Sequence, residues 1–295
     1  MKFWVIDERH VWHAPIIEAA QRHGFDGKRI FRGDEAGEGY GFIRCHADPN
    51  ALKRNHRDWD VMASRLTMIQ DRDQVLLYEN KSGQFERWGE WMPPTWRFTN
   101  CDLAMQFLET AEYPLVSKAD VGASSVNVRI LSDKAQAQQH VRQIFGAGIT
   151  VKHCAGKAQS VQRGYVLFQQ FIPHTVTWRV NAVGYTRAIF KRFCYPDKPV
   201  AQTGNVEPVM DLDDETESLL EFADSFFEHA NTKWCALDIL RDGDKWRLLE
   251  TSLAWPWPSP GACNGAPLFG SKDKRWIQLF DVLFDEIESG SWGKI

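Results

Sequence analysis

The stretch at residues 233–256, KWCALDILRDGDKWRLLETSLAWP, constrains the fold of this chain more than any other. It has the pattern of two apolar strands joined by a tight turn at Asp242-Gly243. Each strand carries one acid among hydrophobic residues, Asp238 in the first strand and Glu250 in the second. Because a buried carboxylate costs free energy unless it is paired, two of them on facing strands predict a cation site. The alternative is a surface hairpin whose acids are solvated.

The length of the loop decides whether the two acids share a face of the hairpin. An even loop pairs Asp238 with Arg247 and places the acids on opposite faces. A three-residue loop over 242–244 pairs Asp238 with Leu248, so that the acids become diagonal neighbours about 7–8 Å apart. We predict the three-residue loop, because only that arrangement lets both carboxylates reach one Mg²⁺ or a close pair of ions. Gly243 supplies the positive φ that such a loop needs.

Composition limits the class of protein. The 295 residues are enough for two or three compact units, and the 43% hydrophobic content is ordinary for a soluble globular chain. A net charge of −4 gives no global basic field, so nucleic acid is not an expected partner. No apolar run approaches the roughly 18 residues of a membrane span, and acids come too early in MKFWVIDERH for a signal peptide. With six cysteines that show no paired spacing, these features predict a reduced, cytoplasmic protein without a membrane partner.

The order of the predicted elements divides the chain into three segments. KFWVID, APIIEAAQRHG and KRIFRG alternate as strand, helix and strand, which predicts a small α/β unit with parallel strands over residues 1–75. Segment 76–172 contains predicted helices in CDLAMQFLETA and SDKAQAQQHVRQIFG and predicted strands in YPLVSKADV and GYVLFQQFI, after a Trp-rich stretch from about 70 to 98 that we expect to be irregular. Segment 173–295 contains a predicted hairpin in TWRVNAVG-TRAIFKRFCY, a long helix, the acidic hairpin and a closing helix.

Lys118 lies at the end of a predicted strand and is followed by a turn of small residues, GASS, at 122–125. Small residues let backbone N–H groups approach phosphate oxygens, and a lysine adds a point charge. The arrangement departs from the Walker pattern, in which the lysine follows the glycines and a helix comes next. Taken alone, this stretch fits an ordinary surface turn better than a phosphate site.

The order of these pieces resembles the ATP-grasp superfamily. A strand ending in lysine, a Gly/Ser loop, the stretch YVLFQQFI, an Arg-bearing strand and an acid-turn-acid hairpin follow one another over about residues 75–260. The resemblance implies an α/β (α+β) ATP-grasp fold, in which two α+β subdomains clasp ATP after a small Rossmann-like α/β domain. It assigns 76–172 to the subdomain with Lys118 and the phosphate loop, and 173–295 to the subdomain with the metal-binding hairpin. It also implies ATP with one or two Mg²⁺ ions, or Mn²⁺ in their place.

Carried over position by position, the resemblance implies a set of site residues. The implied nucleotide contacts are Lys81, Lys118, Gly122, Ser124, Ser125, Gln169, Gln170, Phe171, Ile172 and Asn205. The implied catalytic residues are Arg179 and Arg192, and the implied metal ligands are Asp238, Glu250 and Ser252. Two of these positions depart from the family pattern, since Ser252 stands where Asn is common and Gln170 where Glu is common.

The resemblance therefore predicts an ATP- and Mg²⁺-dependent ligase that joins a small-molecule carboxylate to an amine through an acylphosphate, with an amino acid or peptide-like substrate. Two alternatives stay open: a kinase of the same fold that phosphorylates a hydroxyl, and a non-catalytic ATP-binding regulatory protein, which Ser252 motivates. The sequence is compatible with a homodimer. The rigid WPWP run that contains Trp255 and Trp257 is expected to form either a wall of the acceptor pocket or a packed crossover without substrate contact.

Overall fold

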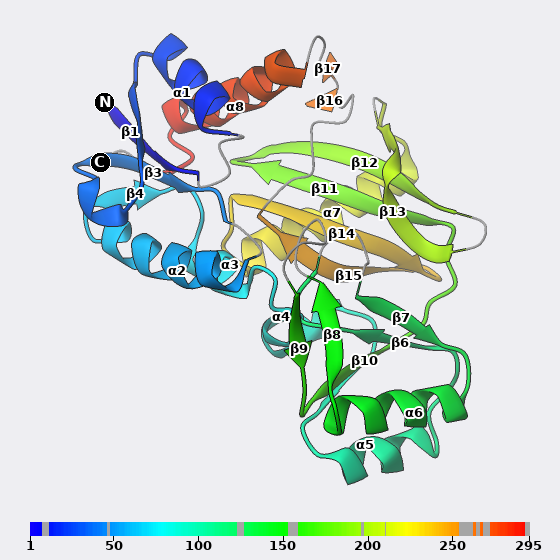
Figure 1. Cartoon of the computed structure of the whole chain (residues 1–295). Coiled ribbons are helices and arrows are strands. Elements are labelled where there is room, and N and C mark those ends of the chain that lie inside the picture. The colour runs from blue at the N-terminus through cyan, green and yellow to red at the C-terminus, as the bar shows by residue number, and fades with distance from the viewer. Residues whose placement is uncertain are drawn as a thin grey trace.

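The computed structural model of the chain describes residues 1–7, 12–45, 48–122, 127–152, 159–195, 198–209, 211–253, 262–263, 266–267 and 272–292. Over these ranges, helices and several sheets combine in a mixed α/β architecture, as predicted. Three larger sheets follow one another through the molecule (Figure 1), and the chain passes from one sheet to the next in sequence order. No helix within the described ranges is both long and apolar enough to cross a membrane.

The first sheet is parallel and has the order β2-β1-β3-β4, with β1 (Lys2–Ile6), β2 (Asp26–Ile30), β3 (Gly39–Ile43) and β4 (Leu66–Met68). Its interior strands β1 and β3 are buried over almost their whole length, because helices cover both faces of a parallel sheet. Helix α2 (Pro49–Ala63) lies on one face, and α1 (His13–Arg22) lies on the other, while η1 (Gly33–Glu35) connects β2 to β3. The predicted parallel unit is confirmed, although the sequence analysis did not assign β3.

The C-terminal helix α8 (Lys272–Glu288) packs beside α1 (Figure 1), far in sequence from the sheet that it covers. Phe280 and Phe284 of α8 are fully buried in the same apolar cluster as Phe3 of β1. The rings of Phe3 and Phe284 meet edge to face, with centroids 4.8 Å apart. The last helix of the chain therefore completes the hydrophobic core of the first sheet.

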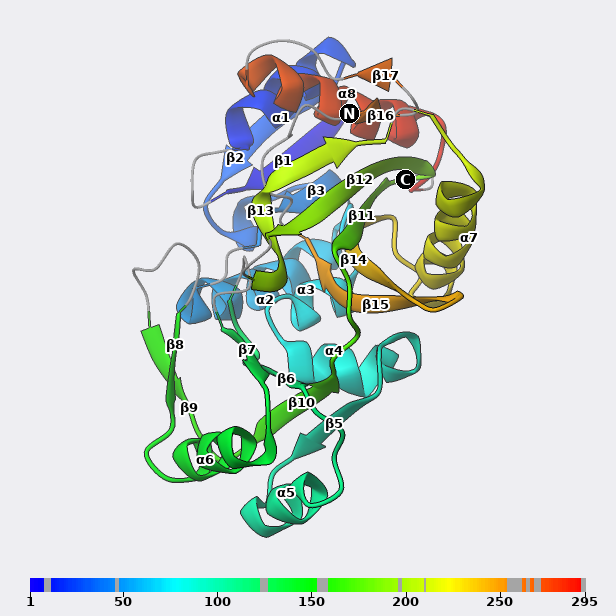
Figure 2. The same cartoon turned by 90° about the vertical axis from the view of Figure 1, so that its right-hand side faces the viewer.

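The second sheet is antiparallel and has the order β5-β10-β6-β7, with β5 (Thr95–Phe98), β6 (Leu115–Lys118), β7 (Val128–Leu131) and β10 (Val166–Gln170). Helices α5 (Cys101–Leu108) and α6 (Lys134–Phe145) cover one of its faces, and β8 (Ile149–Lys152) with β9 (Gln159–Gln162) forms a ribbon beside it (Figure 2). Both helices begin after a polar N-cap, since the side chains of Asn100 and Asp133 accept hydrogen bonds from backbone N–H groups of the first turn.

Residues 70–98 are not irregular, so this part of the sequence prediction is wrong. They form α3 (Arg72–Leu77), α4 (Lys81–Trp88) and the short turn η2 (Gly89–Trp91) before β5. Asp71 and Asn80 cap the two helices through their side chains. Helices of two turns are too short for a 3.6-residue apolar period to emerge from the sequence. Lys81 consequently lies in the first turn of a helix.

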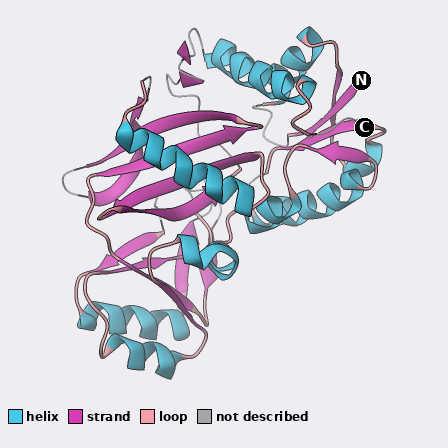
Figure 3. Ribbon diagram, turned by 180° about the vertical axis from the view of Figure 1, so that it is seen from behind, coloured by secondary structure: helices cyan, strands magenta, loops and turns pink. Residues whose placement is uncertain are grey.

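The third sheet is antiparallel and has the order β13-β12-β11-β14-β15, with β11 (Val176–Val183), β12 (Thr186–Tyr195), β13 (Lys198–Pro208), β14 (Trp234–Asp242) and β15 (Lys245–Ser252). Helix α7 (Asp214–His229) crosses one face of it (Figure 3) and packs on the buried residues Val180 and Leu237. The predicted hairpin between β11 and β12 turns at Gly184-Tyr185, with Gly184 at φ +59. A two-stranded pair, β16 (Ala262–Cys263) and β17 (Ala266–Pro267), follows later in the chain.

The loop of the acidic hairpin is shorter than predicted. Asp242 pairs with Lys245, which leaves the two-residue loop Gly243-Asp244, so the predicted three-residue loop is wrong. Gly243 has φ +61, which matches the left-handed conformation that tight hairpin loops require. With this even loop alone, regular pairing would place Asp238 and Glu250 on opposite faces of the sheet.

A β-bulge restores the common face. Ile239 pairs with Leu248, but the next residue, Asp238, pairs with Glu250, so Leu249 is an extra residue in β15. The two acids therefore stand directly opposite each other, closer than the diagonal arrangement predicted from sequence. Ile239 and Leu248 point instead into the core beneath α7.

Candidate functional site

Asp238 lies in the middle of the polar face of the third sheet and is held by two arginines. Its neighbour on β11, Arg179, donates from Nε and Nη2 to the two carboxylate oxygens, each at 2.7 Å. Arg192 of β12 donates from Nη1 to Oδ1 at 2.8 Å. All three side chains are about nine-tenths buried, with exposures of 8–10%. Burial opposes ionisation of Asp238, but the two guanidinium groups hold the pKa of its carboxyl far below the usual range.

Glu250, opposite Asp238, is the more accessible carboxylate, with 30% of its side chain exposed. The Nζ atom of Lys81 lies 3.3 Å from Glu250 Oε2 and donates to the carbonyl of Gly122 at 3.2 Å. Burial disfavours the charged form of Lys81, but the charges of Glu250 and Glu79 outweigh it and raise the lysine pKa. The first turn of α4 is thereby joined to the acidic hairpin.

Lys118, at the end of β6, reaches from the second sheet to the third. Its Nζ donates to the carbonyl oxygen of Leu249 at 3.2 Å, and Leu249 is the extra residue of the bulge. Burial lowers the pKa of Lys118 to about 8, and the nearby charge of Lys81 acts in the same direction while Glu250 opposes it. The bulge therefore both aligns the two acids and leaves a backbone acceptor for this lysine.

Helix α4 also covers the free edge of β15. The side-chain amide of Gln84 donates to the carbonyl of Thr251 at 3.2 Å and accepts from its N–H at 2.9 Å. An exposed strand edge leaves such backbone groups unpaired, and Gln84 supplies the pairing that a further strand would give. The position of the acidic hairpin is thus fixed by the same helix that carries Lys81.

Gly122 occupies a position that only glycine can take. Its φ is +119, and a Cβ there would lie 2.2 Å from Asn127 Nδ2. The predicted loop residues Ser124 and Ser125 fall outside the described residues. The same holds for Trp255 and Trp257 and for the side chain of Asn205, whose backbone belongs to β13.

Segment 169–172, which is among the implied nucleotide contacts, begins at the end of β10 and leads from the second sheet to the third. Gln169 is buried and donates from Nε2 to the hydroxyl of Thr95 at 2.9 Å. The backbone N–H of Gln170 donates to the Pro94 carbonyl at 2.8 Å, and the Ile172 carbonyl lies 2.7 Å from a ring nitrogen of His174. Several polar groups of this segment are therefore already hydrogen-bonded, and the side chain of Phe171 is half-buried.

Strand β11 carries a row of polar atoms that was not predicted from the sequence. Thr177 Oγ1, Arg179 Nη1 and Asn181 Oδ1 are buried and have no hydrogen-bond partner among the described residues. They share the face that bears Asp238, because alternate residues of a strand point the same way. By strand register, Asn181 lies in line with Ala236 and then Ser252, so Ser252 occupies the row next to the two acids. The alternation of Thr, Arg and Asn with Trp, Val and Ala could have revealed this row.

The donor set fits an anionic ligand together with a divalent cation. The cationic side chains that converge on this face are Lys81, Lys118, Arg179 and Arg192, against the carboxylates Asp238 and Glu250. A buried, unpartnered guanidinium N–H calls for an anionic acceptor. Glu250 is accessible to a cation, and Asp238 Oδ2 accepts one hydrogen bond from the described residues, so within these ranges both carboxylates retain a lone pair for a hard metal ion.

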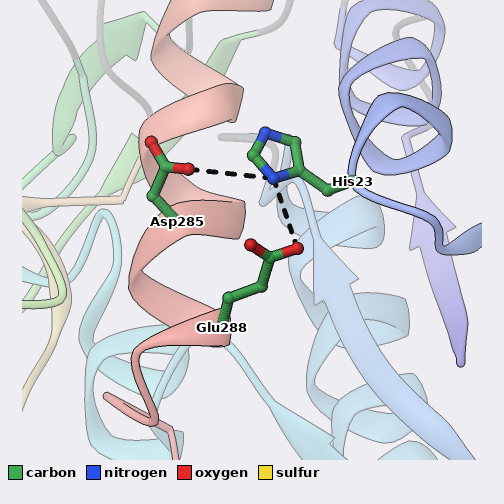
Figure 4. Close-up of side chains that lie close together, drawn as sticks. All are labelled: His23, Asp285 and Glu288. Carbon is green, nitrogen blue, oxygen red and sulfur yellow. Dashed lines mark ion pairs between the residues drawn. The ribbon is translucent and has the colours of Figure 1, made fainter.

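A second group of ionisable residues lies between the C-terminal ends of α1 and α8. His23 Nδ1 is 3.4 Å from Glu288 and 3.8 Å from Asp285 (Figure 4), and the histidine ring stacks on Phe284. The carboxylates of Asp285 and Glu288 are more than half exposed, at 68% and 51%. We assign these residues a structural role, in which their ion pairs link the ends of α1 and α8.

Comparison with known proteins rests on structure. No protein-family model and no curated protein matches the chain. Among solved structures, a RimK domain protein ATP-grasp from Sphaerobacter thermophilus superposes with a TM-score of 0.61, covering 98% of this chain and 100% of that chain at 15% identity. D-alanine–D-alanine ligase from Bacillus anthracis gives 0.60, covering 99% of this chain and 97% of the ligase at 12% identity.

The ATP-grasp ligase PsnB, solved with a minimal precursor, Mg and ADP, gives a TM-score of 0.62 at 11% identity, with 97% of this chain and 98% of PsnB covered. At identities this low, the similarity supports a shared fold. The superpositions cover nearly the whole chain. The three sheets, their order along the chain and these superpositions together show that the chain has the fold of the ATP-grasp superfamily.

Proposed function

We propose that this protein is an ATP- and Mg²⁺-dependent ligase that activates a carboxylate as an acylphosphate and joins it to an amine. The observation that carries the proposal is the convergence of Lys118, Arg179 and Arg192 on the Asp238–Glu250 pair, within an ATP-grasp fold. Solved neighbours include D-alanine–D-alanine ligase complexed with ATP and PsnB with Mg and ADP, which supports this reading.

In this proposal the nucleotide lies between the second and third sheets. Lys81 and Lys118 bind the phosphates, the backbone of Gly122 and the following Ser124 and Ser125 approach them, and 169–172 contacts the adenine. Asn205 stays a proposed contact on the strength of the resemblance. We likewise propose 76–172 and 173–295 as the two halves of the clasp and 1–75 as the preceding domain. The two lysines that reach toward the acidic hairpin from α4 and β6 support this placement.

Glu250, Asp238 and Ser252 would hold Mg²⁺, which supplies charge neutralisation at the phosphate oxygens when it is bound. Glu250 is the first candidate, because its carboxylate is accessible and, among the described residues, only Lys81 pairs with it. On Asp238 the arginines leave one lone pair of Oδ2 without a donor from the described part of the chain. Ser252 can contribute a hydroxyl or hold a metal-bound water from the neighbouring row.

The arginines carry the phosphoryl chemistry in this scheme. Asp238 fixes both guanidinium planes, so that Arg179 Nη1 is left to donate to an oxygen of the transferring phosphoryl or of the acylphosphate. Fixed donors of this kind stabilise developing charge without reorganising. The chemistry needs no protein nucleophile. Consistently, burial raises the pKa of the Cys235 thiol on β14, which keeps this thiol protonated.

Calorimetric titration with ATP, with and without Mg²⁺, tests the nucleotide site in the wild type and in Asp238→Asn/Glu250→Gln. We expect Mg²⁺-dependent binding that the double substitution abolishes. A screen of amino acids and amines then follows release of ADP and phosphate, which a ligase produces only when a carboxylate and an amine are both present. ADP formation with a hydroxyl substrate alone would identify a kinase. Tight binding without turnover would identify a regulatory nucleotide binder.

A further inference from the structure

Glu79 makes an unusual contact at the proposed nucleotide site. It precedes Asn80, the N-cap of α4, and has φ +55, a left-handed conformation that is costly for a residue with a side chain. From there its carboxylate reaches across 43 positions of sequence, and Oε2 accepts a hydrogen bond from the backbone N–H of Gly122 at 2.5 Å. Backbone strain that is stored at a site calls for a functional reason.

Both polar atoms of the Gly122 backbone are engaged from the same side. Glu79 takes the N–H, and Lys81 donates its ammonium to the carbonyl at 3.2 Å. Asn127 packs against Gly122 on the side where a Cβ would lie, since such a Cβ would come within 2.2 Å of Asn127 Nδ2. Asn127 is itself fixed, since its side chain donates to the carbonyl of Lys152 at 2.8 Å and accepts from the N–H of Lys152 at 3.0 Å.

A carboxylate oxygen accepts from this N–H in the way that a phosphate oxygen would. Both are anionic acceptors that form charge-assisted hydrogen bonds to backbone N–H groups. Glu79 also contributes to the field that raises the pKa of Lys81, the neighbouring cation of the proposed phosphate site. A phosphate that approaches Gly122 therefore meets a carboxylate already bound to the same donor and already close to the same lysine.

We propose that Glu79 is an internal competitor for the nucleotide phosphates and sets the nucleotide affinity of this protein. Its carboxylate binds the Gly122 N–H in the ligand-free protein and is displaced when a phosphate oxygen takes that N–H. The inference rests on the proposed function, because it requires Gly122 to be a phosphate contact. It implies that part of the phosphate binding free energy is spent on displacing Glu79, whereas binding of the nucleoside alone is unaffected.

The experiment is calorimetric titration of the full-length protein with Mg²⁺·AMP-PNP and, separately, with adenosine. The variants are Glu79→Gln, Glu79→Ala and Glu79→Asp, whose shorter side chain withdraws the carboxylate from Gly122. The matched control is Glu221→Gln on the exposed face of α7, which makes the same change in net charge. We expect Mg²⁺·AMP-PNP to bind about tenfold more tightly to Glu79→Ala, the effect of removing one charge-assisted competitor. Adenosine affinity should be the same in all variants, and thermal melts confirm that each is folded.

The direction in which Glu79→Ala changes the affinity for Mg²⁺·AMP-PNP tests the inference. Weaker binding of Mg²⁺·AMP-PNP by Glu79→Ala would overturn the inference and make Glu79 a support of the Gly122 backbone. Equal affinity would also overturn it, since the contact would then not compete. Binding by the Glu79 variants but not by the wild type would support it in its strongest form. If no variant and no wild type binds nucleotide, the proposed function itself fails and takes this inference with it.

Discussion

At the scale of single residues, the site is dominated by ionic groups that are buried together. Asp238 keeps its charge because Arg179 and Arg192 surround it, and its pKa therefore lies below the ordinary value of 3.8. A carboxyl group whose pKa is lower in the folded state than in the unfolded state stabilises the fold above its unfolded-state pKa. This stabilisation is lost only as the pH falls through the folded-state pKa, so the cluster is intact throughout the neutral range. For Lys118 the consequence is the opposite, because a lowered pKa disfavours the charged form of a lysine. Burial lowers the pKa of Lys118 to about 8, which lies within the pH range of ordinary assays.

Lys118 should make nucleotide affinity depend on pH near 8. The protonated lysine attracts phosphate, and its ligand-free pKa of about 8 means that the neutral form predominates above that value. We expect the affinity for Mg²⁺·AMP-PNP to fall about tenfold for each pH unit above 8, with proton uptake on binding that calorimetry in buffers of different ionisation enthalpy detects. Lys118→Arg keeps its charge and should flatten this profile. An unchanged profile in Lys118→Arg would assign the dependence to another group.

Arg179 should be coupled to Asp238 in stability. Arg179→Met leaves the buried carboxylate with Arg192 as its remaining partner among the described residues, and we expect the free energy of unfolding to fall by about 3 kcal/mol. Because the Arg179–Asp238 pair can be lost only once, the loss in the double variant with Asp238→Asn should be smaller than the sum of the two single losses. Denaturant unfolding of the two single variants and the double variant measures this coupling. Strictly additive losses would contradict it.

At the scale of elements, the decisive features are a short helix and a bulge. Helix α4 carries Lys81 to Glu250 and pairs the edge of β15 through Gln84. The bulge at Leu249 brings Asp238 and Glu250 face to face in spite of an even loop. Neither feature has a strong local sequence signal, and both depend on what packs against them.

Gln84 should therefore contribute more stability than an ordinary surface glutamine. Gln84→Ala leaves the N–H and carbonyl of Thr251, a buried residue, without their partners, and we expect a loss of about 2 kcal/mol in the free energy of unfolding. Gln139→Ala, at an exposed position of α6, is the matched control and should change stability by less than about 0.5 kcal/mol. Equal losses in the two variants, measured by denaturant unfolding, would argue against the pairing.

Gly122 and Gly164 allow backbone strain to be separated from crowding. Both have positive φ, +119 and +80, but a Cβ at Gly122 would lie 2.2 Å from Asn127, whereas nothing lies within 4 Å at Gly164. We expect Gly122→Ala to weaken Mg²⁺·AMP-PNP binding by about tenfold or more, since one lost backbone contact to phosphate is worth roughly that factor. Gly164→Ala should lower the melting temperature only slightly and leave the affinity unchanged. Calorimetry and thermal melts of both variants test this difference.

At the scale of the whole molecule, the proposed site lies where the second and third sheets meet. Lys118 and Lys81 bridge that junction through Leu249 and Glu250, and the chain passes through it at 169–172. A ligand bound between two sheets stabilises the folded state by mass action, and it does so only while both sheets hold their residues in place.

Nucleotide with metal should therefore raise the melting temperature of the whole protein. At about a hundredfold excess over the dissociation constant, the expected stabilisation is about 2.7 kcal/mol, which corresponds to several degrees for a chain of this size. Chelation with EDTA should remove the Mg²⁺-dependent part of the increase, and Glu250→Gln should lose it as well. A melting temperature that rises equally with and without Mg²⁺ would exclude Glu250 from a metal role.

Local signals were sufficient for much of the fold. The helical patterns in the sequence located α5, α6 and α7, and alternation located β11 with its turn at Gly184-Tyr185. The helices α3 and α4 were not predicted because two turns hold too few apolar positions. Strand β3 was not predicted because glycines at two of its five positions weaken the strand signal. The predicted hairpin loop was wrong, because a bulge depends on contacts with neighbouring elements that the two strands alone do not encode.

From the sequence alone we could predict the acidic hairpin and the candidate lysines and arginines of the site, but not Glu79 and not the polar row of Thr177, Arg179 and Asn181, although the two-residue repeat of a strand places that row on one face. The partners of these groups became known only from the fold. Arg179 and Arg192 donate hydrogen bonds to Asp238, Lys81 forms an ion pair with Glu250, and Glu79 accepts a hydrogen bond from the N–H of Gly122. The physical reason is distance along the chain. Arg179 and Asp238 are 59 positions apart and Lys118 and Leu249 are 131, so these pairings form only when separate sheets pack together.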